Sequence, residues 1–266
     1  MDALTAYGSD DDSDGSTVES KSTVIPILNE TQARQEGIFA RSVPHTVGNW
    51  AGHIYLDLDW AYQEEKAEVD SDNDTYANEW VECRRRWTER LQDHLQRRNL
   101  PIKALVVHEN CHVSLSKTFY LQHYNIESFV SSLRTALHSS VVKSSLTLRV
   151  DGNPTLVLSK LLDLPNGEQK RHQSRTFWCA QVHPPLLDLV KTVDAVLKDT
   201  WKLPVFYDPP LFHTSWASAP GDWTTPSTPL PALFEESFFF TIQHVTCRIG
   251  DKIFRIPLDV FHGSGI

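Results

Sequence analysis

The sequence has few cysteines, and they stand far apart from one another. Among its 266 residues there are four, and no two of them form a C-x-x-C pair. Disulfide scaffolds and zinc ribbons need closely spaced cysteines, so the sequence argues against both. We expect reduced thiols, as in proteins of the cytosol or the nucleus.

Long apolar runs are also missing. No stretch approaches the ~20 apolar residues that a membrane-spanning helix needs. The first residues lack the basic region followed by an apolar stretch that is typical of a secretory signal, so none is expected. Nevertheless 40% of the residues are hydrophobic and 10% are aromatic. This composition predicts a packed globular protein with a sizeable core.

Basic residues are outnumbered, and the formal net charge is −9. Much of the excess of acidic residues lies in two segments. Residues 1–23 contain six acidic residues and one lysine, and residues 64–82 contain eight acidic residues and one lysine. The remaining chain is therefore mildly basic. Charge neither demands nor excludes a nucleic acid as the partner.

The chain divides into a tail and one folded domain. Residues 1–37 are predicted to be a disordered acidic, Ser-rich tail, because the segment has little apolar surface to bury, and residues 38–266 are predicted to fold. The alternation of His53–Asp59 predicts a strand with Asp57 and Asp59 facing solvent. The acidic segment Glu64–Glu79 is expected to be a solvated insertion or loop.

Helices and strands are mixed along the rest of the chain. Trp80, Trp87, Leu91 and Leu95 share one face of a helix predicted over residues 80–98, and its arginines are expected to be solvated. Residues 126–137 and 186–197 have the same helical spacing. Strands are predicted at residues 104–107, 146–150, 155–158, 176–182 and 238–242, with a hairpin over 245–257 that turns at Gly250-Asp251. This mixture favours an α+β fold.

Two His-x-Ser motifs, His112–Ser114 and His213–Ser215, are the strongest chemical signal. In a strand, residues i and i+2 point to one face, so each motif presents an imidazole beside a hydroxyl. Two such strands side by side suit transesterification of an RNA phosphodiester. One neutral histidine accepts the proton of the 2′-hydroxyl, and one protonated histidine donates to the leaving 5′-oxygen. The serines donate hydrogen bonds to the phosphate.

The residues around both motifs resemble the 2H phosphoesterase superfamily. Within it, they are most similar to the phosphodiesterases that trim the 3′ end of spliceosomal U6 small nuclear RNA. The matching segments are Cys111–Ser116, Phe206–Trp216, the Pro-His-x-x-Gly-Asn-Trp-Ala signature within Val43–Ala51, and the end of the C-terminal hairpin, Phe254–Leu258. One departure is Trp216, which stands where the family commonly has an aliphatic residue and is expected to alter the nucleotide pocket.

The resemblance implies an α+β fold of two pseudo-symmetric α/β lobes, whose antiparallel sheets face a central cleft. It implies a 3′→5′ exoribonuclease that removes terminal uridines and leaves a 2′,3′-cyclic phosphate or a 3′ phosphate. The catalytic residues would be His112 and His213, with Ser114 and Ser215 binding phosphate and Tyr207 stacking on a base. We take His213 as the base and His112 as the acid, an order that the near-equivalent motifs leave open.

The resemblance also defines what the enzyme would need. No metal and no cofactor are expected, since the histidines move the protons. The expected partners are RNA 3′ ends, namely U6 small nuclear RNA and oligouridine tails, and not a membrane. The expected location is the nucleus, and the expected state is a monomer.

Three other interpretations remain open at this point. His108-Glu109-Asn110-Cys111-His112 fits the H-E-x-x-H zinc motif, which requires a helix, although its apolar neighbours favour a strand. A second possibility is another 2H activity, such as a cyclic phosphodiesterase acting on nucleotides or tRNA-splicing products. A third is an RNA-binding protein without turnover.

Overall fold

The computed structural model describes residues 24–36, 38, 47–69, 79–98, 100, 102–140, 145–152, 156–163, 172–224 and 237–258. The helical elements are α1 (Glu30–Gln35), α2 (Leu58–Val69), α3 (Glu79–Arg97), the 3₁₀ turn η1 (His123–Asn125), α4 (Ile126–Ser139), α5 (Leu187–Ala195) and the π-helical turn η2 (Val196–Thr200). The strands are β1 (Ile27–Asn29), β2 (Asn49–Asp57), β3 (Leu105–Val107), β4 (His112–Ser114), β5 (Phe119–Gln122), β6 (Leu146–Val150), β7 (Leu156–Asp163), β8 (His172–His183), β9 (His213–Pro220), β10 (Phe238–Ile242), β11 (His244–Ile249) and β12 (Lys252–Pro257).

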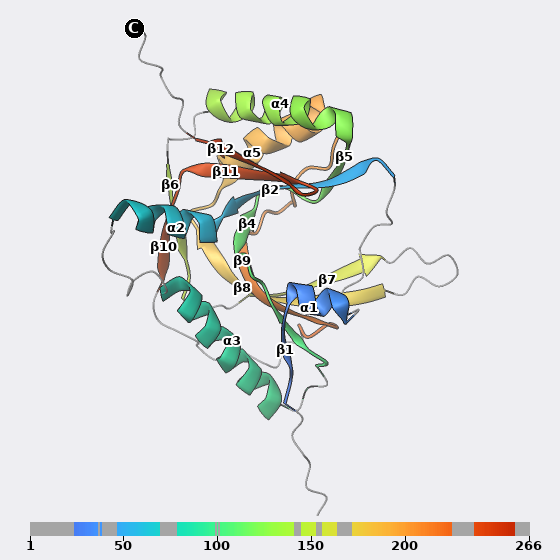
Figure 1. Cartoon of the computed structure of the whole chain (residues 1–266), viewed down its shortest axis with the longest axis vertical. Coiled ribbons are helices and arrows are strands. Elements are labelled where there is room, and N and C mark those ends of the chain that lie inside the picture. Colours follow the sequence, from blue (N-terminus) through green and yellow to red (C-terminus); the bar gives the residue numbers. More distant parts are fainter. Residues whose placement is uncertain are drawn as a thin grey trace, which may run out of the picture.

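A short pairing between the three-residue strand β4 and the eight-residue strand β9 joins the two halves of the sheet. The hydrogen-bonded order is β10-β6-β8-β9-β4-β2-β11-β12, with β1, β3, β5 and β7 attached beside this path. One half contains β2, β5, β11 and β12, and the other contains β3, β6, β7, β8 and β10 (Figure 1). The expected α+β class is confirmed, and the strand pairs are antiparallel except that β1 runs parallel to β3.

Helices cover one face of each half of the sheet. In Figure 1, α4 and α5 lie above β2 and β11, and α3 lies below on the other half. The Phe129 ring of α4 contacts Phe119 of β5 at 5.0 Å between ring centres. On α3, the predicted apolar face is buried as expected: Trp80 packs edge-on against Phe240, and Trp87 packs against Trp216. Each such side chain contributes roughly 1.5–3 kcal/mol by leaving water.

The boundary predicted for the N-terminal tail is wrong at its C-terminal end. Residues 27–35 form β1 and α1, and the Ile25 and Ala33 side chains are buried. The helix begins with a capping box, in which the Asn29 side chain accepts from Gln32 N and the Gln32 side chain accepts from Asn29 N. The short apolar run pairs with β3, a partner that is distant in sequence. Residues 1–23 lie outside the described residues.

The segment expected to be an acidic loop is helical in its first part. Residues 58–69 form α2, which begins directly after β2, so the strand ends at Asp57 rather than Asp59. Glutamate, alanine and lysine are good helix formers, and this outweighs the local charge. Residues 70–78, the rest of that acidic segment, lie outside the described residues.

The C-terminal hairpin has the predicted turn. Strands β11 and β12 pair from His244↔Pro257 to Ile249↔Lys252, and Gly250 at the turn has a positive φ of 63°. A Cβ atom at Gly250 would approach the Trp50 ring to 2.2 Å, so both backbone conformation and space require glycine. Among the described helices, none is both long and apolar enough to cross a membrane.

Candidate active site

The two His-x-Ser motifs lie on adjacent antiparallel strands. Val113 of β4 pairs with Thr214 of β9, and both of these side chains are buried. This register sets His112 across from Ser215 and Ser114 across from His213. All four side chains are half-buried and share the face opposite Val113 and Thr214, which we call the site face. The structure therefore brings together the four residues that the motifs singled out.

Both imidazoles are held in the same way. Nδ1 of His213 is 2.9 Å from the carbonyl oxygen of Leu211, and Nδ1 of His112 is 3.5 Å from that of Asn110. A carbonyl only accepts, so the neutral rings carry their proton on Nδ1 and a lone pair on Nε2. The longer contact at His112 is the weaker restraint. In each ring Nε2 is therefore the nitrogen that can exchange a proton with a ligand.

The surroundings shift both histidines in the same direction. Burial lowers the pKa of His213, and the hydrogen bond to the Leu211 carbonyl partly opposes it. Burial also lowers the pKa of His112. The hydrogen bond that His112 donates to the Asn110 carbonyl opposes this shift, nearby Asp57 and Glu30 also raise the pKa, and His108 lowers it further. Among the described residues, carboxylates therefore raise the pKa of His112 but contribute nothing to the shift of His213.

A third histidine, His53 of β2, belongs to the same cluster and was missed by the sequence analysis. Its Nε2 is 3.1 Å from Ser114 Oγ, and its ring lies edge-on to His112 at 5.2 Å. Tyr55, two residues further on, pairs with Ser114 in the strand register and has its ring 5.1 Å from that of His112. The alternation of His53–Asp59 predicted which residues share a face. It carried no signal that β4 would be the neighbouring strand.

The second serine has a different neighbour. Ser215 pairs in register with Cys179 of β8, and the two side-chain atoms are 3.1 Å apart. Burial raises the pKa of Cys179 to about 12, so it stays a neutral thiol. Each site hydroxyl is thus oriented by one side chain of the next strand, His53 for Ser114 and Cys179 for Ser215.

Tyr207 lies in the loop before β9 and is 48% exposed. The Lys117 ammonium, three residues after Ser114, lies 4.7 Å from the centre of the Tyr207 ring. This contact joins the segment that follows the first motif to the segment that precedes the second. The exposed ring is accessible to a base, and the cation beside it suits a phosphate.

A buried ion pair supports the turn that leads into His112. Arg84 of α3 and Asp59 of α2 lie 3.1 Å apart, with side chains only 10% and 12% exposed. Asp59 accepts from Cys111 N at 2.7 Å, and Arg84 donates to the carbonyl oxygens of His108 and Glu109. The predictions that Asp59 faces solvent and that Arg84 is solvated were both wrong, because both side chains form hydrogen bonds to the backbone of the turn before β4.

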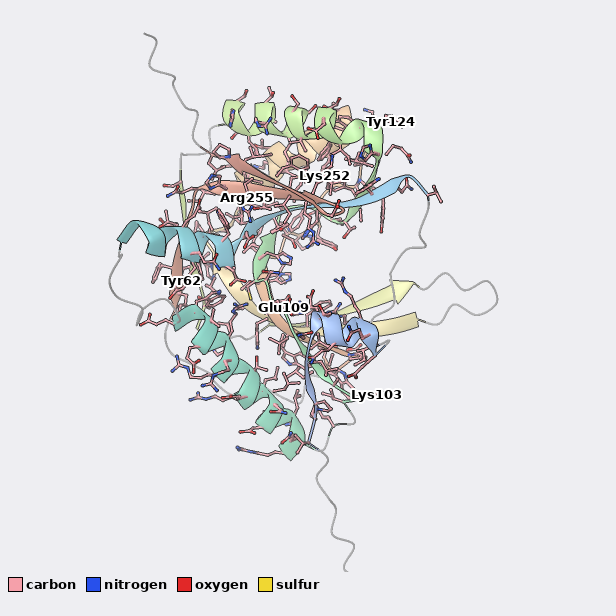
Figure 2. The ribbon with its side chains drawn as sticks, viewed as in Figure 1. Tyr62, Lys103, Glu109, Tyr124, Lys252 and Arg255 are labelled. Carbon is pink, nitrogen blue, oxygen red and sulfur yellow. The ribbon has the colours of Figure 1, made fainter. Side chains whose placement is uncertain are left out.

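The H-E-x-x-H segment is not a helix. Residues 108–111 form a turn between β3 and β4, and Figure 2 labels Glu109 within it. Both ring nitrogens of His108 have partners of their own: its Nδ1 is 2.8 Å from Glu30, and its Nε2 is 3.1 Å from Ser218. The two histidines therefore do not share a helical face, as that zinc motif requires. In the described part of the chain, no three His, Cys, Asp or Glu side chains are grouped to hold a metal.

Two further features that the sequence analysis singled out are Trp216 and the Gly-Asn-Trp-Ala segment. Trp216 is fully buried against Trp87 of α3, on the face of β9 opposite Ser215, so it does not line the nucleotide pocket as expected. The Gly-Asn-Trp-Ala part of the family signature begins at Gly48, which has a φ of 84°, and runs into β2. Residues 43–46, the start of that signature, lie outside the described residues.

Comparisons with known proteins agree on the family and the fold. The model of the HVSL family, described as an uncharacterised conserved protein, matches residues 19–257. U6 snRNA phosphodiesterase 1 of Danio rerio is 28% identical over 242 residues, covering 85% of this chain and 73% of that protein. The Homo sapiens protein of the same name is 26% identical over 243 residues, covering 86% and 77%.

A solved structure has the same architecture. Kluyveromyces marxianus Usb1 with uridine monophosphate superposes with a TM-score of 0.52 at 13% sequence identity. The match covers 78% of this chain and 98% of the other. At this identity the likeness concerns the fold, and it supports the 2H architecture expected from the motifs.

The buried ion pair predicts a strong dependence of stability on Arg84. Arg84→Met should leave the Asp59 carboxylate buried without its partner and lower the free energy of unfolding by about 3–5 kcal/mol. The measurement is urea unfolding followed by tryptophan fluorescence. Arg85→Met is the matched control, because Arg85 lies on the same helix but pairs with Glu82 and Glu89 at the exposed surface. The urea midpoint of Arg85→Met should stay near that of the parent. Equal losses of stability in the two variants would contradict the role of Arg84 in supporting the turn before His112.

Proposed function

Because the chain belongs to the HVSL family, we propose that it is an RNA phosphodiesterase of the 2H type. It acts as a 3′→5′ exoribonuclease that trims U-rich 3′ ends of U6 small nuclear RNA. The observation that carries the proposal is the β4–β9 register, in which two imidazoles and two hydroxyls share one face. The names of the Danio rerio and Homo sapiens relatives support the same substrate.

The proposed reaction is a transesterification. One imidazole Nε2 takes the proton of the 2′-hydroxyl, whose oxygen attacks the adjacent phosphorus. The bond from phosphorus to the 5′-oxygen of the terminal nucleotide breaks, and the other imidazole gives that oxygen a proton. The shortened RNA retains a 2′,3′-cyclic phosphate, or a 3′ phosphate if water opens the ring. The hydroxyls of Ser114 and Ser215 donate to the non-bridging oxygens as charge develops there.

The surroundings of the two histidines support His213 as the base and His112 as the acid. The shorter hydrogen bond of His213 Nδ1 holds the tautomer with its lone pair on Nε2, as a base requires. Asp57 and Glu30 favour the protonated form of His112, as an acid requires. No step needs a metal ion or a cofactor, because both proton transfers and the phosphate contacts are assigned to side chains.

We assign Tyr207 to stacking on a base near the scissile phosphate, since its exposed ring lies in the loop that leads into His213. The proposal includes the nucleus as the location, because the substrate named for the relatives is a small nuclear RNA. It also includes a monomeric enzyme, because all groups of the site come from one chain.

The first prediction from this proposed function concerns the nucleophile and the two histidines that transfer protons. A U-tailed RNA with a 2′-deoxy sugar on the 5′ side of the scissile phosphate should bind but not be cleaved. His112→Ala and His213→Ala should each lower kcat by a factor of ~10²–10⁴, and the double variant should be little worse. EDTA should leave the rate unchanged. End groups are identified by mass spectrometry.

The control for these variants is His123→Ala, since His123 is exposed in η1 and contacts Trp50 rather than the site. It should retain the parent rate. Cleavage of the deoxy substrate, or a loss of activity in EDTA that zinc restores, would refute the mechanism. Cleavage of a cyclic mononucleotide but not of oligouridylate would indicate another 2H activity, and binding without any cleavage would indicate a non-catalytic protein.

A second prediction follows from the lowered pKa values of His112 and His213. The base is active above its pKa and the acid below its own, so kcat/KM should be bell-shaped. Burial lowers both, so the maximum should lie below the ordinary imidazole pKa of ~6.5. The measurement is kcat/KM on oligouridylate across the pH range. A rate that still rises above neutral pH would contradict this arrangement.

The third prediction separates stacking from proton transfer at Tyr207. Tyr207→Phe should retain most activity, whereas Tyr207→Ala should raise KM about tenfold, as expected if a stacked base contributes ~1–3 kcal/mol. Tyr124→Ala is the matched control, because Tyr124 is a more exposed tyrosine, on η1 (Figure 2). If Phe were as damaging as Ala, the hydroxyl rather than the ring would be the functional group.

A further inference from the structure

The site face continues from the catalytic strands across the neighbouring hairpin. In the sheet register, Ser114 of β4 pairs with Tyr55 of β2, which pairs with Thr246 of β11, which pairs with Arg255 of β12. Paired residues of antiparallel strands project to the same face. Two residues further along β11 from Thr246, Arg248 pairs with His53 of β2. We call Arg248 and Arg255 the arginine strip.

Both side chains of the arginine strip are exposed, and neither guanidinium group forms an ion pair with a carboxylate of the described residues. Within the described residues, Arg248 has one hydrogen bond, from Nε to the Gly250 carbonyl at 3.2 Å. The guanidinium carbon of Arg255 lies 3.7 Å from the centre of the Trp60 ring. Three other arginines differ, since Arg84 and Arg149 pair with aspartates and Arg85 pairs with glutamates.

The contacts that the two arginines do make orient them without neutralising them. Stacking on Trp60 fixes the plane of the Arg255 guanidinium and leaves its N–H edge available. The bond of Arg248 Nε to a carbonyl leaves both terminal nitrogens free to donate. Asp57 lies on the same face, but its carboxylate accepts from Trp60 N at 3.0 Å. In a chain with a net charge of −9, two oriented cations beside the site form a local positive surface.

An exposed apolar side chain lies within the strip. Ile253 of β12 pairs with Arg248 and is 47% exposed. Proteins that bind single-stranded nucleic acid combine cations that contact the phosphates with exposed surface that contacts the bases, and Ile253 offers a small apolar surface beside Arg248. Figure 2 shows Arg255 and Lys252 on this hairpin, in the same half of the molecule as β2. Phe254–Leu258, a segment that no step of the reaction uses, lies here.

We propose that the arginine strip binds phosphates of the RNA body, on the 5′ side of the scissile bond. The proposal rests on the proposed exonuclease function and extends it to the substrate beyond the terminal nucleotides. An enzyme that removes nucleotides from a 3′ end has only a short segment on the 3′ side of the cut. Strands are ~4.8 Å apart, so Arg255 lies three strands, or roughly 14 Å, from Ser114. Only the body of the RNA reaches that far.

The test measures binding separately from cleavage. The probe is a fluorescent oligouridylate of about 12 nucleotides, within the usual site size of single-strand binders, with a 2′-deoxy sugar at the cleavage position. Anisotropy titrations at several salt concentrations give the dissociation constant and its salt dependence. Arg248→Gln with Arg255→Gln should weaken binding about tenfold. The log–log salt slope should fall by about 1.4, because each phosphate contact on a single strand contributes ~0.7.

Two further variants make the result specific. Arg134→Gln removes an exposed arginine of α4, on the opposite side of the sheet, and should leave both quantities unchanged. Replacing Arg248 and Arg255 by lysine keeps the charge and should retain most of the salt slope. An unchanged slope in the glutamine variant, or a lysine variant as weak as the glutamine variant, would overturn the proposal.

Failure of the strip and failure of the proposed function give different results. If the parent protein does not cleave U-tailed RNA, the proposed function is wrong, and the binding titration still tests the strip. If the parent cleaves normally and the glutamine variant binds the 12-mer as the parent does, only the proposal about the arginine strip is wrong. Thermal unfolding of each variant checks that the fold is intact.

Discussion

The buried ion pair between Asp59 and Arg84 is the interaction on which the site most depends. It joins α2 and α3 to the turn that precedes β4, through hydrogen bonds to the backbone of His108, Glu109 and Cys111. A turn before a three-residue strand has little structure of its own to hold it. Because His112 is the first residue of that strand, the position of its imidazole depends on a charge pair that lies behind it.

The second constraint is the antiparallel register of β4 and β9. With Val113 opposite Thr214, each histidine lies across from the serine of the other motif. The two half-sites are alike in their backbone contacts, since both Nδ1 atoms meet the carbonyl two residues earlier. They differ in their neighbours, with His53 beside Ser114 and Cys179 beside Ser215. A symmetric pair of motifs thereby obtains two different electrostatic environments, as an acid and a base require.

The charge of the protein is compatible with RNA because it is unevenly distributed. Much of the negative excess lies within residues 1–23 and 64–82, whereas the face beside the histidines carries Lys117, Arg248 and Arg255. Net charge describes solubility and long-range steering, but contacts to phosphates depend on the few cations near the site. Arg84, Arg85 and Arg149 are occupied by ion pairs within the fold, whereas Arg248 and Arg255 form no ion pair within the described residues and are available to a ligand.

The sequence by itself determined whatever depends on local periodicity. Alternation along a strand sets His112 and Ser114 on one face, and helical spacing sets the buried face of Trp80 and Trp87, because backbone geometry fixes where neighbours point. Only the tertiary structure decided which strands and helices became neighbours. That pairing brought His53 to Ser114, buried Asp59 with Arg84, ordered β1 against β3 and aligned the arginine strip with the site. Contacts between residues 25 or more positions apart depend on the packing of the whole core, and no local pattern of residues encodes them.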